Sequence, residues 1–283
     1  MDNKFSKRNA IQALGALAFN GNLKGFIEGK IYTGNSKTIC VPVLNCYSCP
    51  GAIGSCPIGA MQSVSNTPKF NISHYVLGLL VLFGITGGRI YCGYLCPFGF
   101  FQDMLYKIKS IKLKHGKILN VLKYLKYVIL LVFVFILPVI TKDVLGMSDP
   151  MFCKYICPSG TLFAGLPLIG LNPLLQDALG GLFIWKLSLA ILIVILSIIL
   201  FRPFCRFLCP LGAFYAIFNG ISFYKFNIND NCISCGKCKK ACGYHIYTKE
   251  TPNSPECIRC DECIKACPVN SIEKEFLNKK ISK

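Results

Sequence analysis

Residues 232–242 read CISCGKCKKAC and residues 257–268 read CIRCDECIKACP, so the spacing Cys-x-x-Cys-x-x-Cys-x-x-x-Cys occurs twice. Three closely spaced cysteines on a wrapping loop supply three corners of a [4Fe–4S] cluster, and the fourth thiolate comes from the other repeat. The spacing therefore predicts two clusters with crossed ligands. One is expected on Cys232, Cys235, Cys238 and Cys267, and the other on Cys257, Cys260, Cys263 and Cys242.

Two other uses of these cysteines are less consistent with the spacing. Zinc sites also use Cys-x-x-Cys pairs, but typically two pairs separated by a longer spacer. Disulfides would require an oxidising compartment. A segment this short with few large aliphatic residues cannot build a sufficient core alone, so cluster binding is expected to supply folding energy. We therefore expect residues 223–283 to form a small α+β domain of the bacterial 2[4Fe–4S] ferredoxin type.

The rest of the chain, residues 1–222, has the composition of a membrane protein. Of the 283 residues 53% are hydrophobic and 16% are charged, against about 25% charged in an ordinary soluble domain. Residues 75–91, 124–140 and 185–201 are long and apolar enough to cross a hydrocarbon core of about 30 Å. Residues 10–27 are interrupted by polar side chains, so they could span or lie in the interface; spanning is the favoured interpretation.

We therefore expect a mainly α fold with a polytopic membrane domain of about four transmembrane helices. The segment 161–184 is broken by Pro167 and Pro173 and suits a re-entrant or interfacial hairpin better than a span. Lysines crowd the loop at 107–126 and basic residues occupy the N-terminus, which places both on the cytoplasmic face of the cell membrane. The ferredoxin-like domain is then cytoplasmic as well. The basic residues behind the formal charge of +18 thus lie where a protein in a lipid bilayer places them, and no nucleic acid partner is expected.

A short Cys-Pro motif recurs in the membrane domain, at Cys56-Pro-Ile-Gly, Cys92-x-x-x-Cys96-Pro-Phe-Gly, Cys153-x-x-x-Cys157-Pro-Ser-Gly and Cys205-x-x-x-Cys209-Pro-Leu-Gly. The recurrence indicates an internal duplication with a pseudo-two-fold axis along the membrane normal. Such an axis pairs Cys92 and Cys96 with Cys205 and Cys209. On the other side it pairs Cys153 and Cys157 with Cys56 and one or more of Cys40, Cys46 and Cys49.

The motif suits a metal centre at a helix end. Cys-x-x-x-Cys places both sulfurs on one helix face, and the proline ends that helix and can open the next. The glycine leaves room for backbone amides to approach the sulfurs. Candidate ligands are Cys92, Cys96, Cys205 and Cys209 for an inner centre, and Cys46, Cys49, Cys56, Cys153 and Cys157 for an outer one. The alternatives are small apolar core residues and, for the outer group, disulfides.

Other chemistry has little support in the sequence. The three histidines, His74, His115 and His245, do not suit a haem within the membrane. Arg89 lies close to Cys92, where it could snorkel to the interface or compensate the charge of a cluster. The chain has no GxGxxG, P-loop or convincing catalytic triad, so no catalytic residue is assigned. It is expected to act within an oxidoreductase system rather than as a stand-alone enzyme.

The chain resembles the NapH-type membrane ferredoxin proteins, with related arrangements in the NosR and CcoG groups. The resemblance rests on FNGNLKGFIEGKIYTG (residues 19–34), NCYSCPGAIGSCPIGAMQS (residues 45–63), the motifs YCGYLCPFG and CRFLCPLGAFY, and the two C-terminal cluster motifs. It implies about four spans, two [4Fe–4S] clusters facing the cytoplasm, and electron transfer between a quinol pool or cytoplasmic donor and a partner redox protein. NapH proteins act beside a periplasmic nitrate reductase, a partner that is not transferred to this chain.

Three functions are therefore weighed. The leading one is an electron-transfer subunit with two [4Fe–4S] clusters, one or two further centres on the Cys-Pro cysteines, and a quinone as a further candidate cofactor. The alternative is an assembly factor that reduces or passes a metal such as copper through the soft Cys-Pro sites. A structural scaffold, in which the clusters only fold the domain, is the third.

Overall fold

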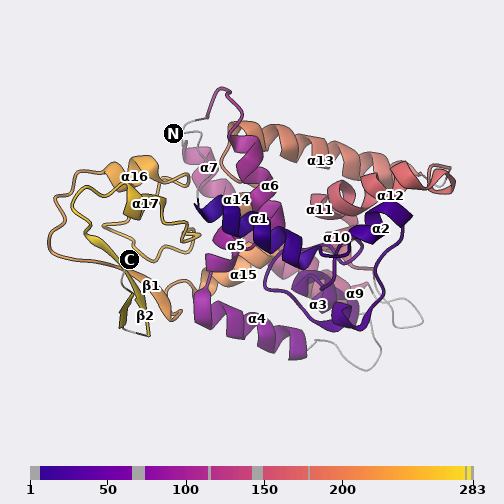
Figure 1. Ribbon diagram of the computed structural model, residues 1–283, viewed down its shortest axis with the longest axis horizontal. Helices are drawn as coiled ribbons and strands as arrows, with labels where there is room; N and C mark the ends of the chain where they lie inside the picture. The colour runs from indigo at the N-terminus through magenta and orange to yellow at the C-terminus, as the bar shows by residue number, and fades with distance from the viewer. Residues whose placement is uncertain are drawn as a thin grey trace.

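The computed structural model describes residues 7–65, 74–113, 116–141, 149–177, 179–277 and 279–281. Within them the chain is mainly helical, with a small antiparallel sheet near the C-terminus, as the sequence predicts. The helices fill the centre and right of Figure 1, and the C-terminal unit with α16, α17 and the sheet lies at the left.

The N-terminal segment forms two short helices rather than one long one. Helix α1 (Lys7–Phe19) is followed by α2 (Leu23–Glu28) and the 3-10 turn η1 (Asn35–Thr38). Asn20 donates its side-chain amide to the carbonyl of Ala16 and Asn22 donates to that of Pro50. Such side-chain bonds compete with the helix. The 13 residues of α1 reach only about 20 Å at 1.5 Å per residue, so the expected continuous span over 10–27 is not formed.

The next apolar stretch is also shorter than expected. Helix α4 (His74–Gly87) has 14 residues and extends about 21 Å. It ends because Gly88 has φ +54°, which a residue with a side chain rarely adopts. A Cβ at Gly88 would lie 2.5 Å from Oδ1 of Asn219, so the chain turns against that side chain.

Two helices in the described ranges are long and apolar enough to cross a membrane, Ile118–Ile140 and α13 (Gly181–Ile199). The first contains α7 (Lys117–Leu122), α8 (Leu125–Ile129), the π-helical η2 (Leu130–Ile136) and α9 (Leu137–Ile140). Pro138 lacks the N–H that the preceding turn needs, which accounts for the π-helical stretch before it. Helix α13 exposes Ile184, Trp185, Ile191, Leu192 and Ile195. Two candidate spans are thus present, and the four-span topology stays a prediction.

Each Cys-Pro motif lies at the start of a helix. In the three Cys-x-x-x-Cys-Pro motifs a short helix ends before the second cysteine and the next helix begins at the proline, as predicted. These pairs are α5 (Ile90–Tyr94) with α6 (Pro97–Tyr106), α10 (Met151–Tyr155) with α11 (Pro158–Gly160), and α14 (Pro203–Phe207) with α15 (Pro210–Phe218). Cys56 directly precedes α3 (Pro57–Ser65), and α11 continues into η3 (Thr161–Gly165), α12 (Leu166–Leu171) and η4 (Pro173–Leu175).

The C-terminal unit combines a sheet with two short helices. Strand β1 (Tyr224–Ile228) pairs antiparallel with β2 (Ile272–Phe276), which pairs with β3 (Lys279–Ile281). Helices α16 (Lys237–Ala241) and α17 (Glu262–Lys265) each belong to one cysteine motif. Phe226, Cys263 and Ile272 form a small buried apolar cluster within this unit, while Tyr244 and Ile258 are buried in the cluster of the helices.

This unit is fixed to the helices through Asn219 and Arg259. The Asn219 amide donates to the carbonyls of Ser254 (2.8 Å) and Cys257 (2.7 Å). Arg259, with φ +54°, donates to the carbonyls of Gly87 and Asn219, both at 2.7 Å. Because these bonds are buried, they hold the second cysteine motif against the ends of α4 and α15.

Candidate iron–sulfur centres

The eight C-terminal cysteines gather into two groups of four. One cavity is lined by Cys232, Cys235, Cys238 and Cys267. A second is lined by Cys242, Cys257, Cys260 and Cys263. Each group takes three cysteines from one repeat and one from the other, which is the crossed arrangement that the sequence predicts.

The two repeats share their turn geometry. Positive φ angles occur at equivalent positions, in the pairs Ser234 and Arg259, Gly236 and Asp261, and His245 and Asn270. Repeated left-handed turns direct successive backbone amides to one side, the concave arrangement that commonly surrounds iron–sulfur centres. The backbone amide of Ser271, for example, donates to Sγ of Cys267 at 3.4 Å.

Two thiols show how the environment affects these candidate ligands. Burial would raise the pKa of Cys267, but hydrogen bonds from the Ser271 hydroxyl and backbone outweigh it and lower that pKa. Burial raises the pKa of Cys257 to about 12. The thiolate is the metal-binding form, so at Cys257 the positive charge of bound iron would have to favour it.

The inner Cys-Pro cysteines also lie together. Cys92, Cys96, Cys205 and Cys209 are all buried, and Gln102, on the helix that follows Cys96, donates to Sγ of Cys205. The thiols of Cys96 and Cys209 accept the backbone N–H groups of Gly99 and Gly212, each at 3.4 Å. The glycines thus let the amides reach the sulfurs, as expected.

Two buried arginines flank this inner group symmetrically. Arg89 donates to the carbonyl of Cys205 at 3.3 Å, and Arg202 donates to the carbonyl of Cys92 at 2.6 Å. Both side chains are fully buried, so Arg89 does not snorkel to an interface. Arg202 was not identified from the sequence. The signal that could have found it is its spacing, because Arg89 and Arg202 each stand three residues before the first cysteine of a Cys-x-x-x-Cys-Pro motif.

Two glutamines, Gln62 and Gln102, were also not identified from the sequence. Gln102 donates to Sγ of Cys205 at 3.1 Å, and Gln62 lies 3.6 Å from Sγ of Cys153. The signal that could have found them is the shared pattern Cys-Pro-x-Gly-x-x-Gln, which begins at Cys56 and at Cys96. Hydrogen bonds to sulfur ligands are one of the features that set the potential of an iron–sulfur centre.

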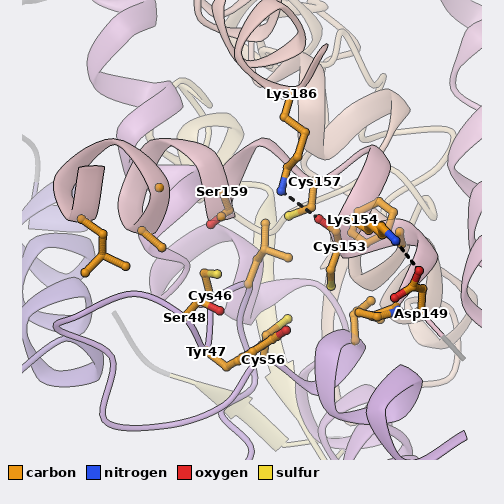
Figure 2. Close-up of a pocket in the computed structure, with 18 residues that line it drawn as sticks. Cys46, Tyr47, Ser48, Cys56, Asp149, Cys153, Lys154, Cys157, Ser159 and Lys186 are labelled. Carbon is orange, nitrogen blue, oxygen red and sulfur yellow. Dashed lines mark hydrogen bonds and ion pairs between the residues drawn. The ribbon is translucent and has the colours of Figure 1, made fainter. Parts of the chain in front are cut away.

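The outer cysteines Cys46, Cys56, Cys153 and Cys157 line a cavity of about 420 Å³. Figure 2 shows them on both sides of it, with Lys186 reaching in from α13. Cys49 does not line this cavity and packs with Ala52 and Ala164. Cys40 lies in an isolated β-bridge with Ser55.

The thiol groups have the donor chemistry of iron–sulfur clusters. All eighteen cysteines are free, so no disulfide joins the outer group. Within the described ranges, no three His, Cys, Asp or Glu side chains converge closely enough to hold one metal ion. The sequence spacing of the C-terminal groups is typical of clusters.

The comparison with protein families agrees with this chemistry. The family described as "4Fe-4S binding domain" matches three times, at residues 75–116, 127–170 and 182–229. Each match contains one Cys-x-x-x-Cys-Pro motif. The matches include the cysteines of these motifs and stop before the C-terminal ligands.

Curated relatives are similar over about two thirds of the chain. An uncharacterized protein of Methanocaldococcus jannaschii is 32% identical over 189 residues, 64% of this chain and 69% of the relative. The methylamine utilization ferredoxin-type protein MauN of Methylobacillus flagellatus is 30% identical, over 59% of this chain and 51% of the relative. The putative electron transport protein YccM of Escherichia coli is 38% identical over 55 residues, 19% of this chain and 15% of the relative. No solved structure matches the chain.

The family matches, together with the ferredoxin-type and electron-transport relatives, support an iron–sulfur protein of the ferredoxin type. The chain belongs to the family that carries this 4Fe-4S binding domain. The chain spans about half to two thirds of the length of the curated relatives it matches. Membership of the narrower NapH group stays a prediction.

Proposed function

We propose that this protein is a membrane-bound electron carrier that passes single electrons between its C-terminal clusters and a centre on Cys92, Cys96, Cys205 and Cys209. The observation that carries the proposal is the position of Tyr244. This residue lines the second C-terminal cavity. Its ring centroid lies 5.9 Å from the guanidinium carbon of Arg89, which donates a hydrogen bond to the carbonyl of Cys205 in the inner group. Tyr244 and Arg89 therefore connect the two candidate centres.

The contact between the two sites is close and dry. Tyr244 is 5% exposed and its ring lies 5.3 Å from that of Phe201, which also lines the second C-terminal cavity. A Cβ on Gly93 would lie 2.2 Å from the carbonyl oxygen of Ile258. Only glycine therefore allows this approach between the residue after Cys92 and the residue after Cys257.

The chain's own residues would hold and insulate these centres. When bound, iron–sulfur clusters supply one-electron chemistry. The cysteines would hold them, and Arg89 and Arg202 would offset part of the negative charge of four thiolates. The rings of Phe201 and Tyr244 exclude water between the sites, which lowers the local dielectric and strengthens that compensation.

Membrane attachment, orientation and partners belong to the proposal as well. The candidate spans Ile118–Ile140 and α13 support a lipid bilayer, and the lysine-rich loop favours a cytoplasmic position for the C-terminal unit. The names of MauN and YccM refer to a ferredoxin-type protein and to electron transport, and we propose a redox protein as partner here. An apolar cavity of about 560 Å³, lined by Leu17, Phe26, Phe101 and Phe163 among others, is where we propose that a quinone would bind.

The test is anaerobic purification in detergent, iron and sulfide quantitation, and EPR after reduction by dithionite. Wild type is compared with Cys92→Ser/Cys205→Ser, and the matched control is Cys40→Ser/Cys49→Ser, which alters two buried cysteines outside the four groups. We expect the test variant to lose about four irons and one EPR signal, and the control to lose neither. Unchanged iron and an unchanged spectrum in the test variant would confine redox chemistry to the C-terminal unit; absence of iron in wild type would refute the electron-carrier function.

A further inference from the structure

We propose that Cys46, Cys56, Cys153 and Cys157 hold a further iron–sulfur cluster, and that Gln62 donates a hydrogen bond to one of its sulfur ligands. The proposal deepens the function above and rests on it. It extends the electron path from the inner cysteine group to the far side of the helical part of the protein.

The four thiols come from different parts of the chain and face one space. All four line the cavity of about 420 Å³, and Gln62, on the helix that follows Cys56, lies 3.6 Å from Sγ of Cys153. Cys56 and Cys157 are buried, while Cys46 and Cys153 are partly exposed. Figure 2 shows the sulfurs around the cavity, with Cys46 and Cys56 opposite Cys153 and Cys157. A centre held here would be enclosed on one side and open on the other.

The site repeats the plan of the inner one. Gln102 accepts the backbone N–H of Phe204 at 3.1 Å and donates to Cys205 Sγ at 3.1 Å. Gln62 accepts the backbone N–H of Phe152 at 3.0 Å and its amide nitrogen lies 3.6 Å from Cys153 Sγ. Each glutamine therefore binds the residue before a cysteine and that cysteine's sulfur. Two sites with the same donor, the same acceptor and four cysteines each are expected to hold the same kind of group.

The cavity has room for a group larger than one ion, and the positive charge of Lys186 lies beside it. A Cβ on Gly160 would lie 3.5 Å from Sγ of Cys46 and 3.9 Å from Nζ of Lys186. The absence of a side chain at this position keeps the space between the sulfurs open. Lys186 donates to the carbonyl of Cys153 at 3.2 Å, so its ammonium would offset the negative charge of a cluster with four thiolates.

Tyr215 places this site next to the inner one. It is fully buried, its hydroxyl donates to the carbonyl of Pro42 at 3.1 Å, and its ring lies 6.1 Å from that of Tyr91, the residue before Cys92. Tyr215 therefore joins the segment of the inner motif to the loop that leads to Cys46. Single electrons that reach the inner centre would pass to the outer one and leave at its exposed edge to a one-electron redox protein.

The experiment compares Cys56→Ser/Cys157→Ser with Cys49→Ser, a buried cysteine nearby that does not line the cavity. Iron, sulfide, copper and zinc are quantified after anaerobic purification, and Mössbauer and EPR spectra are recorded. We expect the test variant to lose about four irons while the signals of the other centres persist, and Cys49→Ser to match wild type. Equal iron in both variants, or stoichiometric copper or zinc lost in place of iron, would overturn the proposal.

A second variant does not remove a ligand. Gln62→Leu is expected to keep the full iron content and to shift the midpoint potential of one signal downward, with the other signals unchanged. A set of potentials identical to wild type would overturn the assignment of Gln62. The outcome is separable from the proposed function, because Cys92→Ser/Cys205→Ser tests the inner centre through a different signal.

Discussion

Arg89, three residues before Cys92, donates to the carbonyl of Cys205. Arg202, three residues before Cys205, donates in return to the carbonyl of Cys92. Each arginine also has a carboxylate partner, because Arg89 pairs with Glu256 at 3.1 Å and Arg202 with Asp103 at 2.5 Å. Glu256 belongs to the C-terminal unit, so this pair also joins that unit to the inner site.

Asp103→Asn should strongly destabilise the protein. The substitution leaves Arg202, which is fully buried, without its anionic partner, and Arg8 loses the same carboxylate. Breaking a buried pair in this way costs about 3–5 kcal/mol. The thermal unfolding midpoint in detergent measures the effect. The control is Glu262→Gln, whose exposed pair with Lys265 is worth at most about 1 kcal/mol; equal midpoints for the two variants would contradict the role of Asp103.

Gln102→Leu should lower the reduction potential of the inner centre. Its amide donates to Cys205 Sγ at 3.1 Å, and that bond favours the more negative, reduced state. Each 1.4 kcal/mol of difference between the two states corresponds to about 59 mV for one electron. We expect a fall of tens of millivolts in an EPR-monitored titration, with iron content preserved. A rise, or no change, would show that Gln102 does not act on the centre.

Asn219→Leu should loosen the C-terminal unit from the helices. The side chain donates to the carbonyls of Ser254 and Cys257 and accepts the backbone N–H of Arg89 at 3.0 Å. Each buried backbone group left without a partner costs about 1–3 kcal/mol. Limited proteolysis should therefore cut faster between α15 and β1 than in wild type. Asn227→Leu is the control, because Asn227 is exposed and bonds to Glu275 within the sheet.

The cysteine pattern predicts much of this site because ligand spacing is a local property. Three closely spaced cysteines in one loop line one cavity, and the fourth cysteine of that cavity comes from the other repeat. The parts that pattern reasoning missed depend on the tertiary fold. Arg202 becomes a partner of Cys92 only when α14 packs near α5, and nothing in its own segment indicates that contact.

The number of membrane-crossing helices was harder to predict, because hydropathy does not report where a helix ends. The apolar stretch 75–91 satisfies a length criterion, yet Gly88 ends α4 early. In the stretch 10–27 the asparagines satisfy backbone carbonyls and break the helix. In contrast, 124–140 and 185–201 contain no such residue and coincide with the two long helices.

Removal of iron should unfold the C-terminal unit while the long helices persist. Within the described ranges its own buried cluster consists of Phe226, Cys263 and Ile272, while its buried Tyr244 and Ile258 pack in the cluster of the helices. A core of that size rarely suffices without a metal or another cross-link. Hydrogen exchange of the iron-depleted protein in detergent should show lost protection over β1 and β2 and retained protection over α13. Protection of β1 and β2 equal to that in the iron-loaded protein would show that the clusters do not fold the unit.

The crossed ligand sets make a prediction that an uncrossed arrangement does not. Cys267 belongs to the second motif but lines the cavity of the first, together with Cys232, Cys235 and Cys238. Cys242 belongs to the first motif and lines the cavity that Tyr244 also lines. Serine is a poorer ligand for iron than a thiolate, so each substitution should alter the EPR signal of one cluster.

Cys267→Ser and Cys232→Ser should therefore change the same signal, and Cys242→Ser and Cys257→Ser should change the other. Because the cavity of Cys242 lies beside Tyr244 and the inner cysteines, spin coupling to the inner centre should be lost with Cys242→Ser and kept with Cys267→Ser. EPR of the dithionite-reduced variants at several temperatures separates these outcomes. If Cys267→Ser instead changed the signal that responds to Cys257→Ser, each cluster would take all four ligands from its own motif, and the path through Tyr244 would have to begin at a different set of sulfurs.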